Sequence, residues 1–227
     1  YDKYTINEQS GLFGLRKIGK TSVLYGLERM IFLRNGCSIY IDCQNTAIHK
    51  SRWNILLYKI IEGLKEKYEL DISTYSKSEY TEEQASSNFE QDLFAIRESF
   101  SNKPKISLIF DEIEHIAFKT SSSDHWKNGN DFIYFWQSIR AIYQKNNSLF
   151  SFVIAGVNPN CIEIPKINGY DNPIFSLITP TYLELFNIQN VTEMVRSIGS
   201  YMGLKFDEEI FTHLTEDYGG HPFLIRH

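Results

Sequence analysis

Residues 14–21 read Gly-Leu-Arg-Lys-Ile-Gly-Lys-Thr, and this stretch decides the expected fold. It is a complete GxxxxGK[ST] pattern, in which two glycines let the backbone wrap so that successive N–H groups face one anion. The following residues carry apolar side chains at helical spacing, so the positive end of a helix dipole would face the same anion. The sequence therefore predicts a phosphate-binding loop. Its candidate nucleotide-binding residues are Gly14, Leu15, Arg16, Lys17, Ile18, Gly19, Lys20, Thr21 and Ser22.

Lys20 and Thr21 have distinct expected roles in this loop. Lys20 would place its charge at the β- and γ-phosphates of a nucleotide, and the Thr21 hydroxyl would reach Mg²⁺. The alternative is a glycine-rich turn that only joins a strand to a helix. A short apolar piece before the loop and an amphipathic helix after it favour the phosphate-binding interpretation.

A second element supplies the acidic groups that such a site needs. Residues 106–110 are apolar and predict a buried strand, which is followed directly by Asp111 and Glu112. Ligands of open α/β sheets bind beyond the carboxyl ends of the strands. Asp111 is expected to hold Mg²⁺ directly or through a water, and Glu112 to polarise a water for attack on the γ-phosphate. A solvated acidic turn is the alternative interpretation of the same pair.

The order of the expected elements indicates the fold class. Strands are expected at 37–43, 106–110 and 150–155, with an extended piece at 181–185, and helices at 20–33, 53–68, 89–100 and 131–144. This alternation predicts an α/β fold with a parallel sheet flanked by helices. Together with the GxxxxGK[ST] pattern at 14–21, it is typical of a P-loop NTPase. Three stretches, 71–87, 119–130 and 161–180, have the composition of an exposed connection, a loop and an irregular segment.

The last part of the chain is expected to be entirely helical. Helices are predicted at 191–202 and 208–218, with another beginning after Gly219 and Gly220. We therefore expect a P-loop ATPase core at 1–185 and the start of a small helical lid at 186–227. Because the sequence begins with Tyr1 rather than Met, a fragment of a longer chain is the expected context.

Three segments together resemble those of a known family. These are GLRKIGKTS at 14–22, LIFDEIEHI at 108–116 and YGGHPF at 218–223. The chain resembles P-loop ATPases of the archaeal-type and STAND groups, which are relatives of AAA+ proteins. The resemblance implies ATP/ADP and Mg²⁺ as cofactors, hydrolysis with Glu112 and Lys20 as catalytic residues, and other domains of the same chain as partners.

The resemblance also implies roles near the end of the chain and after the third strand. Pro222 is similar to the family proline near the adenine and ribose, although a helix break and restart explains residues 219–222 equally simply. His221 is a candidate phosphate sensor. Asn158, which directly follows the stretch 150–157, is a sensor candidate by position and is also a turn former before Pro159.

Several basic and acidic residues have weaker assignments. Arg140 and Arg226 are candidate sensors or arginine fingers, with a solvated helix residue as the alternative for each. Arg16 and Lys17 would face substrate phosphates or solvent. Asp42, at the end of the expected strand 37–43, is expected at the same sheet edge as Asp111.

Composition limits the partners and the compartment. With 23 Lys+Arg against 28 Asp+Glu, the formal charge is -5, which does not support nucleic acid as a partner and does not exclude it. The longest apolar run, 149–157, is far shorter than the roughly 20 residues of a membrane helix, so no membrane partner is expected. Cys37, Cys43 and Cys161 are expected to be structural thiols in a reducing compartment, which predicts a cytoplasmic protein.

The functional hypothesis is Mg²⁺-dependent ATP binding and hydrolysis that switches a larger signalling or sensor protein between conformations or assembly states. Turnover is expected to be slow or to depend on assembly as a homo-oligomer. The first alternative is a nucleotide-dependent scaffold with negligible turnover. The second is a DNA-associated AAA+-type loader, against which the net charge argues.

Overall fold

The structure is a computed structural model that describes residues 9–227. These residues divide into two compact units, one made of 9–13 and 21–181 and the other of 14–20 and 182–227. Each unit is described by itself below. The first eight residues of the expected core at 1–185 lie outside the described residues.

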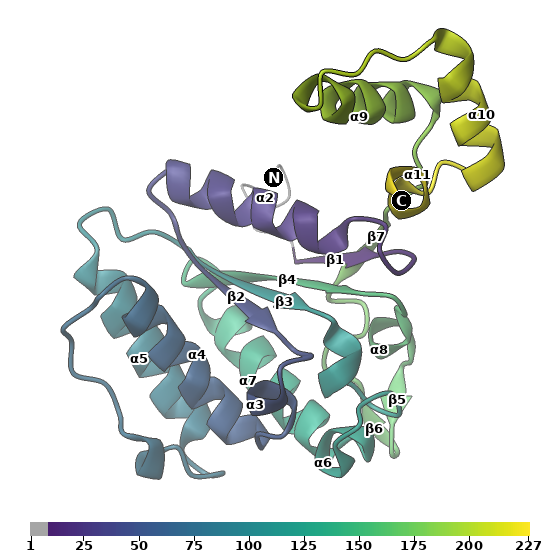
Figure 1. The fold of residues 1–227 in the computed structure, drawn as a ribbon. Coiled ribbons are helices and arrows are strands. Elements are labelled where there is room, and N and C mark those ends of the chain that lie inside the picture. The colour runs from purple at the N-terminus through teal and green to yellow at the C-terminus, as the bar shows by residue number, and fades with distance from the viewer. Residues whose placement is uncertain (1–8) are drawn as a thin grey trace. The chain divides into compact units, whose positions relative to one another are not determined.

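The first unit is built on a sheet with parallel strands (Figure 1). Its strands follow the order β2-β3-β4-β1-β7, and the pairs β2–β3, β3–β4 and β4–β1 are parallel. The expected α/β fold with a parallel sheet flanked by helices is therefore confirmed. The strands are β1 (Ser10–Phe13), β2 (Cys37–Asp42), β3 (Ile106–Asp111), β4 (Phe150–Gly156) and β7 (Thr179–Tyr182).

Helices cover both faces of this sheet (Figure 1). Helix α2 (Lys20–Leu33) lies on one face, whereas α4 (Trp53–Lys67), α5 (Ala85–Ser99) and α7 (Asn130–Lys145) lie on the other. None of the helices within 9–227 is both long and apolar enough to cross a membrane. The shorter elements are α3 (Thr46–His49), η1 (Lys77–Glu79), η2 (Ile113–Ile116), α6 (Asp124–Lys127), α8 (Asn160–Glu163), β5 (Lys166–Ile167) and β6 (Tyr170–Asp171).

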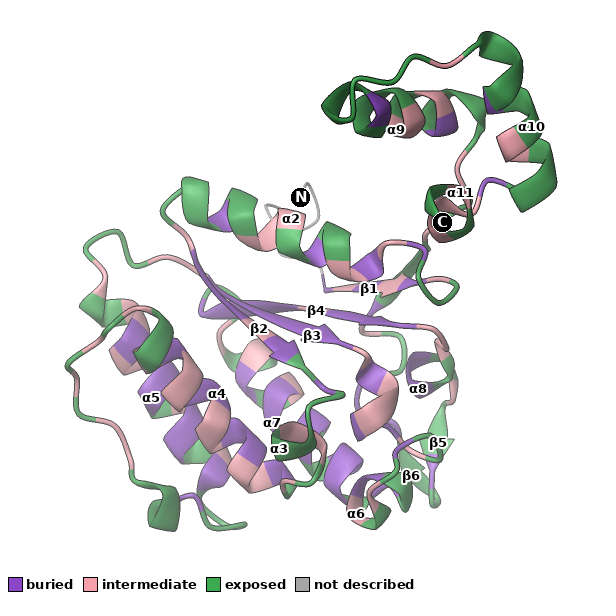
Figure 2. Ribbon diagram, viewed as in Figure 1, coloured by how far each residue is buried: buried purple, intermediate pink, exposed green. Residues whose placement is uncertain are grey.

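The two faces of the sheet carry hydrophobic cores of different size, and more of the residues of α4 and α7 are buried than those of α2 (Figure 2). Successive side chains of a strand point to opposite faces. Phe110 and Phe152, with the strand residues that point to the same face, belong to the large core beneath α4, α5 and α7. The core beneath α2 is much smaller, and its buried members are Leu24, Ile31, Ile109 and Ala155.

Two stretches of polar composition contain buried aromatic residues, so the expectation of an exposed connection at 71–87 was wrong in part. Tyr80, within 71–87, is 1% exposed, and its hydroxyl donates to Asp92 Oδ2 at 2.7 Å. Helix α5 also begins within this stretch, at Ala85. Trp126, within 119–130, is fully buried on α6, and its indole N–H donates to the Ser51 carbonyl at 3.0 Å. In both cases one large side chain is buried although the residues around it in the sequence are polar.

The stretch 161–180 is more ordered than its composition indicates. It holds the antiparallel pair β5–β6, while Ile174 and Ile178 are buried. The buried Asn172 amide donates to the carbonyls of Cys161 and Ile164, both at 2.8 Å. This amide replaces a regular hydrogen-bonding ladder in organising the segment.

The three cysteines are buried free thiols. Burial raises the pKa of Cys37 and of Cys161 to about 12, so both remain protonated at neutral pH. Their position in the core agrees with the expectation of structural thiols.

The N-terminus of α4 is held by an acid from another helix. Asp131, in the first turn of α7, is fully buried, and its Oδ2 accepts bonds from the Trp53 backbone N–H at 3.0 Å and from Arg52 Nε at 2.9 Å. The carboxylate therefore caps a neighbouring helix and partners a cation.

We expect Asp131→Ala to lower the free energy of unfolding by about 2 kcal/mol, because it leaves a buried N–H without its charged acceptor. Chemical denaturation measures this change. Asp71→Ala, at an exposed acid between α4 and α5, is the matched control and should leave stability nearly unchanged. Equal stability of the two variants would contradict the capping role.

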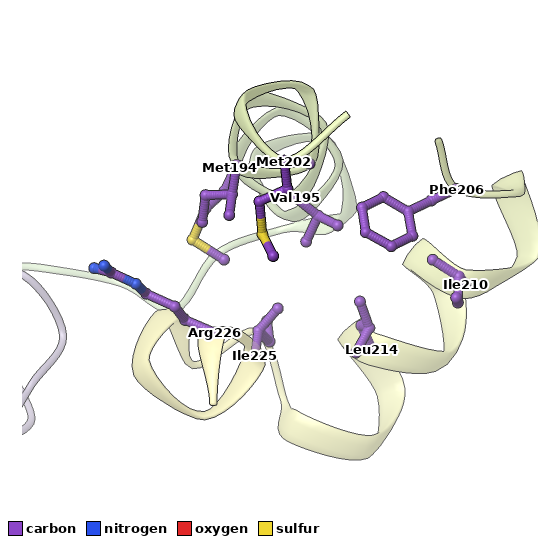
Figure 3. A pocket seen from close by; sticks show the side chains of 10 residues that line it. Met194, Val195, Met202, Phe206, Ile210, Leu214, Ile225 and Arg226 are labelled. Carbon is purple, nitrogen blue, oxygen red and sulfur yellow. The ribbon is translucent and has the colours of Figure 1, made fainter. Parts of the chain in front are cut away.

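The second unit contains three helices that enclose an apolar pocket of about 290 Å³ (Figure 3). They are α9 (Ile188–Tyr201), α10 (Glu208–Tyr218) and α11 (Pro222–Arg226). Figure 3 shows Met194, Phe206 and Leu214 directed toward the pocket, with the guanidinium of Arg226 directed away from it. Since the lining is almost wholly apolar, this pocket lacks the donors that a triphosphate needs.

Candidate nucleotide-binding site

The predicted phosphate loop contains two residues with positive φ angles. Lys17 and Gly19 both have positive φ angles, 61° and 110°, on either side of Ile18. Such left-handed residues within a loop turn neighbouring N–H groups toward one side. Ile18 is buried, whereas the side chains of Leu15, Arg16 and Lys17 are exposed.

Lys20 lies inside this loop rather than in solvent. Lys20 is only 4% exposed, and its ammonium donates to the carbonyls of Gly14 at 3.1 Å and Leu15 at 3.0 Å. The cation is thus held by the loop's own backbone at the first residue of α2. Phosphate oxygens could take the place of these two carbonyls as acceptors.

The second unit also brings the Gly-Gly-His-Pro segment against the loop. The Nε2 atom of His221 lies 3.1 Å from the Arg16 carbonyl, which can only accept, so Nε2 carries the proton. Lys17 Nζ lies 3.7 Å from the ring centroid of Phe223. The buried Nδ1 of His221 has no hydrogen-bond partner among residues 9–227. His221 therefore contacts the backbone of the loop directly.

The two glycines before His221 are required by their conformations. Gly219 ends α10 with φ 58°, and Gly220 has φ 72°. A Cβ on Gly220 would lie 2.0 Å from the Phe186 carbonyl oxygen, while Phe186 N donates to the Gly220 carbonyl at 2.9 Å. Pro222 then occupies the first turn of α11, as a helix restart requires.

Within the first unit, the candidate acidic residues lie at the end of β3. Asp111 ends β3 and is 1% exposed. Its Oδ2 accepts bonds from the Thr21 hydroxyl at 2.7 Å and the Tyr40 hydroxyl at 2.8 Å, and its Oδ1 accepts the Glu112 N–H at 2.9 Å. The first turn of α2 and the end of β3 therefore meet at one carboxylate.

Strand parity and register explain this meeting. Ile109 lies in the small core beneath α2, so Asp111, two residues later, points to the same face of the sheet. Tyr40 pairs with Ile109 in the parallel register and is therefore the diagonal neighbour of Asp111. Burial, followed by the hydrogen bond to Asp111, raises the pKa of Tyr40, so its hydroxyl remains a donor.

Glu112 follows in a conformation that interrupts the strand. Its φ and ψ angles, 50° and 48°, are left-handed, and η2 begins at the next residue. A left-handed glutamate is uncommon and occurs where surrounding structure fixes it. At the carboxyl end of β3 the backbone therefore changes from the extended conformation at Asp111 to the left-handed conformation at Glu112.

Glu114 is a residue that the sequence analysis missed. Its Oε1 accepts the backbone N–H groups of Val157 and Asn158, the latter at 2.8 Å, and thereby links η2 to the end of β4. Its Oε2 is buried with no hydrogen-bond partner in the described part of the chain. A Cβ on Gly156 would lie 2.7 Å from Oε1, so glycine makes room for this carboxylate. The only signal in the sequence was a third acid after Asp111 and Glu112.

The remaining candidates are placed as follows. Asn158 Oδ1 accepts the Asn160 N–H at 2.9 Å, which is the geometry of the turn former considered for it. Arg140 donates to the Pro173 carbonyl at 3.0 Å, a contact within the first unit that occupies part of its guanidinium. Arg226 is exposed at the end of α11. Asp42 pairs with Asp111 in the register but is exposed, and it accepts the Gln44 N–H at 2.9 Å.

The residues present fit Mg²⁺ bound together with a nucleotide. Mg²⁺ prefers oxygen ligands and is usually held by one or two protein groups together with waters and substrate phosphates. A hydroxyl and a carboxylate in direct contact, Thr21 and Asp111, provide such groups. Between residues 9 and 227, no group of three His, Cys, Asp or Glu side chains could hold a metal by itself.

The strand order, the loop after β1 and the acidic end of β3 define the fold of P-loop NTPases. Among solved structures, the chain is similar to a Walker-type ATPase of Pyrococcus abyssi, with a TM-score of 0.64 and 15% identity, covering 99% of this chain and 62% of that one. It is also similar to the ORC2 protein of Aeropyrum pernix in its ADPNP–ADP complexes, with a TM-score of 0.56 and 10% identity over 97% and 56% of the two chains.

A further similar structure is domain III of the replication initiation protein DnaA from Thermotoga maritima, with a TM-score of 0.51 and 12% identity over 96% and 72% of the two chains. With TM-scores above 0.5 and identities of 15% or less, these similarities show a shared fold alone. The chain spans less than two thirds of the Pyrococcus and Aeropyrum proteins. No protein-family model matches the sequence, and no curated protein matches it.

Proposed function

We propose that the chain binds ATP with Mg²⁺ and hydrolyses it, and that hydrolysis drives a conformational or assembly switch in a larger signalling or sensor protein. The observation that carries this proposal is the 2.7 Å hydrogen bond from Thr21 to Asp111. It joins the end of a GxxxxGK[ST] loop to the acidic end of a buried strand, which is the pairing that Mg²⁺–nucleotide binding requires.

In this proposal, different residues of the chain bind the phosphates, hold Mg²⁺ and activate the water. Lys20 would exchange the carbonyls of Gly14 and Leu15 for phosphate oxygens, while backbone N–H groups of residues 14–20 surround the phosphates. Thr21 and Asp111 would hold Mg²⁺, which supplies charge neutralisation to the triphosphate. Glu112 would orient and deprotonate the attacking water.

Residues 218–223 support a switch. His221 contacts the loop backbone. A change of loop conformation on nucleotide binding would therefore alter this contact, which lies directly before α11. Pro222 is proposed as the base contact. Asn158, His221, Arg140 and Arg226 are proposed as candidates for sensing the phosphate. We further propose an ATPase core at 1–185, a helical lid at 186–227, other domains of the same chain and a homo-oligomer as partners, and a cytoplasmic location.

The proposal is tested by ATP hydrolysis measured over a wide range of protein concentration, with Lys20→Ala as the blank. We expect turnover above the blank and a specific activity that rises with concentration, as a site completed between subunits requires. Concentration-independent turnover would contradict assembly. Turnover equal to the blank, with ATP binding retained, would overturn hydrolysis in favour of a nucleotide-dependent scaffold.

A DNA-associated loader is the second candidate, since two of the similar structures are a replication initiation protein and an ORC2 protein. The formal charge of -5 argues against it. Fluorescence anisotropy with labelled duplex DNA, recorded from low to physiological salt, separates the two candidates. ATP-dependent retention at physiological salt would favour the loader.

A further inference from the structure

Tyr40 is a third side chain at the proposed magnesium site, and it comes from neither the loop nor the acidic strand. Its hydroxyl donates to Asp111 Oδ2 at 2.8 Å, the same oxygen that accepts from Thr21 at 2.7 Å. The half-buried tyrosine lies on β2, two residues before that strand ends. A tyrosine hydroxyl is a strong donor to an ionised carboxylate.

The tyrosine is itself held in place. Its ring centroid lies 4.8 Å from that of Tyr25, which follows Thr21 by one turn of α2. The same face of α2 therefore carries both the Thr21 hydroxyl and an aromatic ring against Tyr40. Because of this packing, the Tyr40 hydroxyl has little freedom to leave Asp111.

The carboxylate needs such support because the terminal torsion of an aspartate is broad. Three donors fix the plane of the Asp111 carboxylate, namely the Glu112 N–H on Oδ1 and the hydroxyls of Thr21 and Tyr40 on Oδ2. In the proposed function, Thr21 must also offer its oxygen to Mg²⁺. Tyr40 donates to the same Oδ2 and is not itself one of the proposed magnesium ligands.

We propose that Tyr40 is a positioning residue of the magnesium site, which orients the Asp111 carboxylate and so sets the Mg²⁺ concentration at which nucleotide is bound tightly. The inference rests on the proposed function. Residues that orient a metal ligand typically change metal affinity by about 10-fold or more when removed. ATP binding without Mg²⁺ depends on the loop and is independent of Tyr40.

The test is calorimetry of ATP binding to Tyr40→Phe, in excess EDTA and at a series of Mg²⁺ concentrations. We expect an unchanged affinity in EDTA and a half-saturating Mg²⁺ concentration about 10-fold higher than that of the wild type. Phe keeps the ring packed against Tyr25, so the substitution removes the hydroxyl alone.

Tyr80→Phe is the matched control. It removes another buried hydroxyl bond to an aspartate, from Tyr80 to Asp92 Oδ2 at 2.7 Å, that lies outside the candidate site. We expect both variants to lose thermal stability and only Tyr40→Phe to change the Mg²⁺ dependence. If the Mg²⁺ curves of Tyr40→Phe and the wild type coincide, the inference is wrong. If the wild type binds no ATP at any Mg²⁺ concentration, the proposed function itself is wrong.

Discussion

Lys20→Ala is expected to lower ATP affinity by at least about 100-fold, to the point that binding is lost in ordinary calorimetry. The Lys20 ammonium makes two hydrogen bonds within the loop, to the carbonyls of Gly14 and Leu15. Transferring them to phosphate oxygens makes them charge-assisted on both sides. Two such bonds at roughly 1.5 kcal/mol each correspond to about two powers of ten in affinity.

The matched control for this variant is Lys50→Ala. Lys50 is exposed at the end of α3, so its removal changes the net charge equally without touching the loop. We expect wild-type ATP affinity for this control and unaltered helix content for both variants by circular dichroism. An ATP affinity of Lys20→Ala within a few-fold of the wild type would place the phosphate site elsewhere.

Glu112→Gln is expected to retain ATP affinity and to lower turnover by about 100- to 10,000-fold, the range typical for loss of a general base. Gln keeps the size of the side chain and can adopt the same left-handed turn, but it cannot take a proton from water. Single-turnover hydrolysis, with binding measured on the same preparation, separates the two effects.

Asp42→Asn provides the comparison at the same sheet edge. Asp42 stands opposite Asp111 in the register, is exposed, and would keep an oxygen for the Gln44 N–H as Asn. We expect turnover within a few-fold of the wild type. An equal loss of turnover in both variants would assign the effect to the charge of this edge and exclude Glu112 as the base.

Local patterns were sufficient to predict the strands β2, β3 and β4 and the major helices, whereas β1, β5 and β6 were not predicted as strands. The loop at 14–21 and the acids after β3 are encoded by consecutive residues, so neither depends on which strands are neighbours. The fold class followed from the alternation of strands and helices. The errors fell where one buried aromatic residue, Tyr80 or Trp126, lies in a polar stretch whose composition predicts a loop.

The supporting residues could not be predicted in the same way. Tyr40 reaches Asp111 because β2 pairs with β3 in one particular register. Glu114 reaches the Val157 N–H because β4 lies next to β3 in the sheet. Strand order and register are set by packing over the whole sheet, so a single sequence does not display them locally.

The thin core beneath α2 has a consequence for how the first unit fluctuates. Among residues 9–227, the cluster that holds residues 21–33 of that helix has four buried members and four partly buried ones, whereas the helices on the opposite face share a much larger cluster. Elements with few buried apolar contacts open locally at a lower free energy than the rest of a domain. We therefore expect the segment that carries Thr21 to open locally more readily than the helices on the opposite face, and a ligand bound at its first turn to suppress this opening.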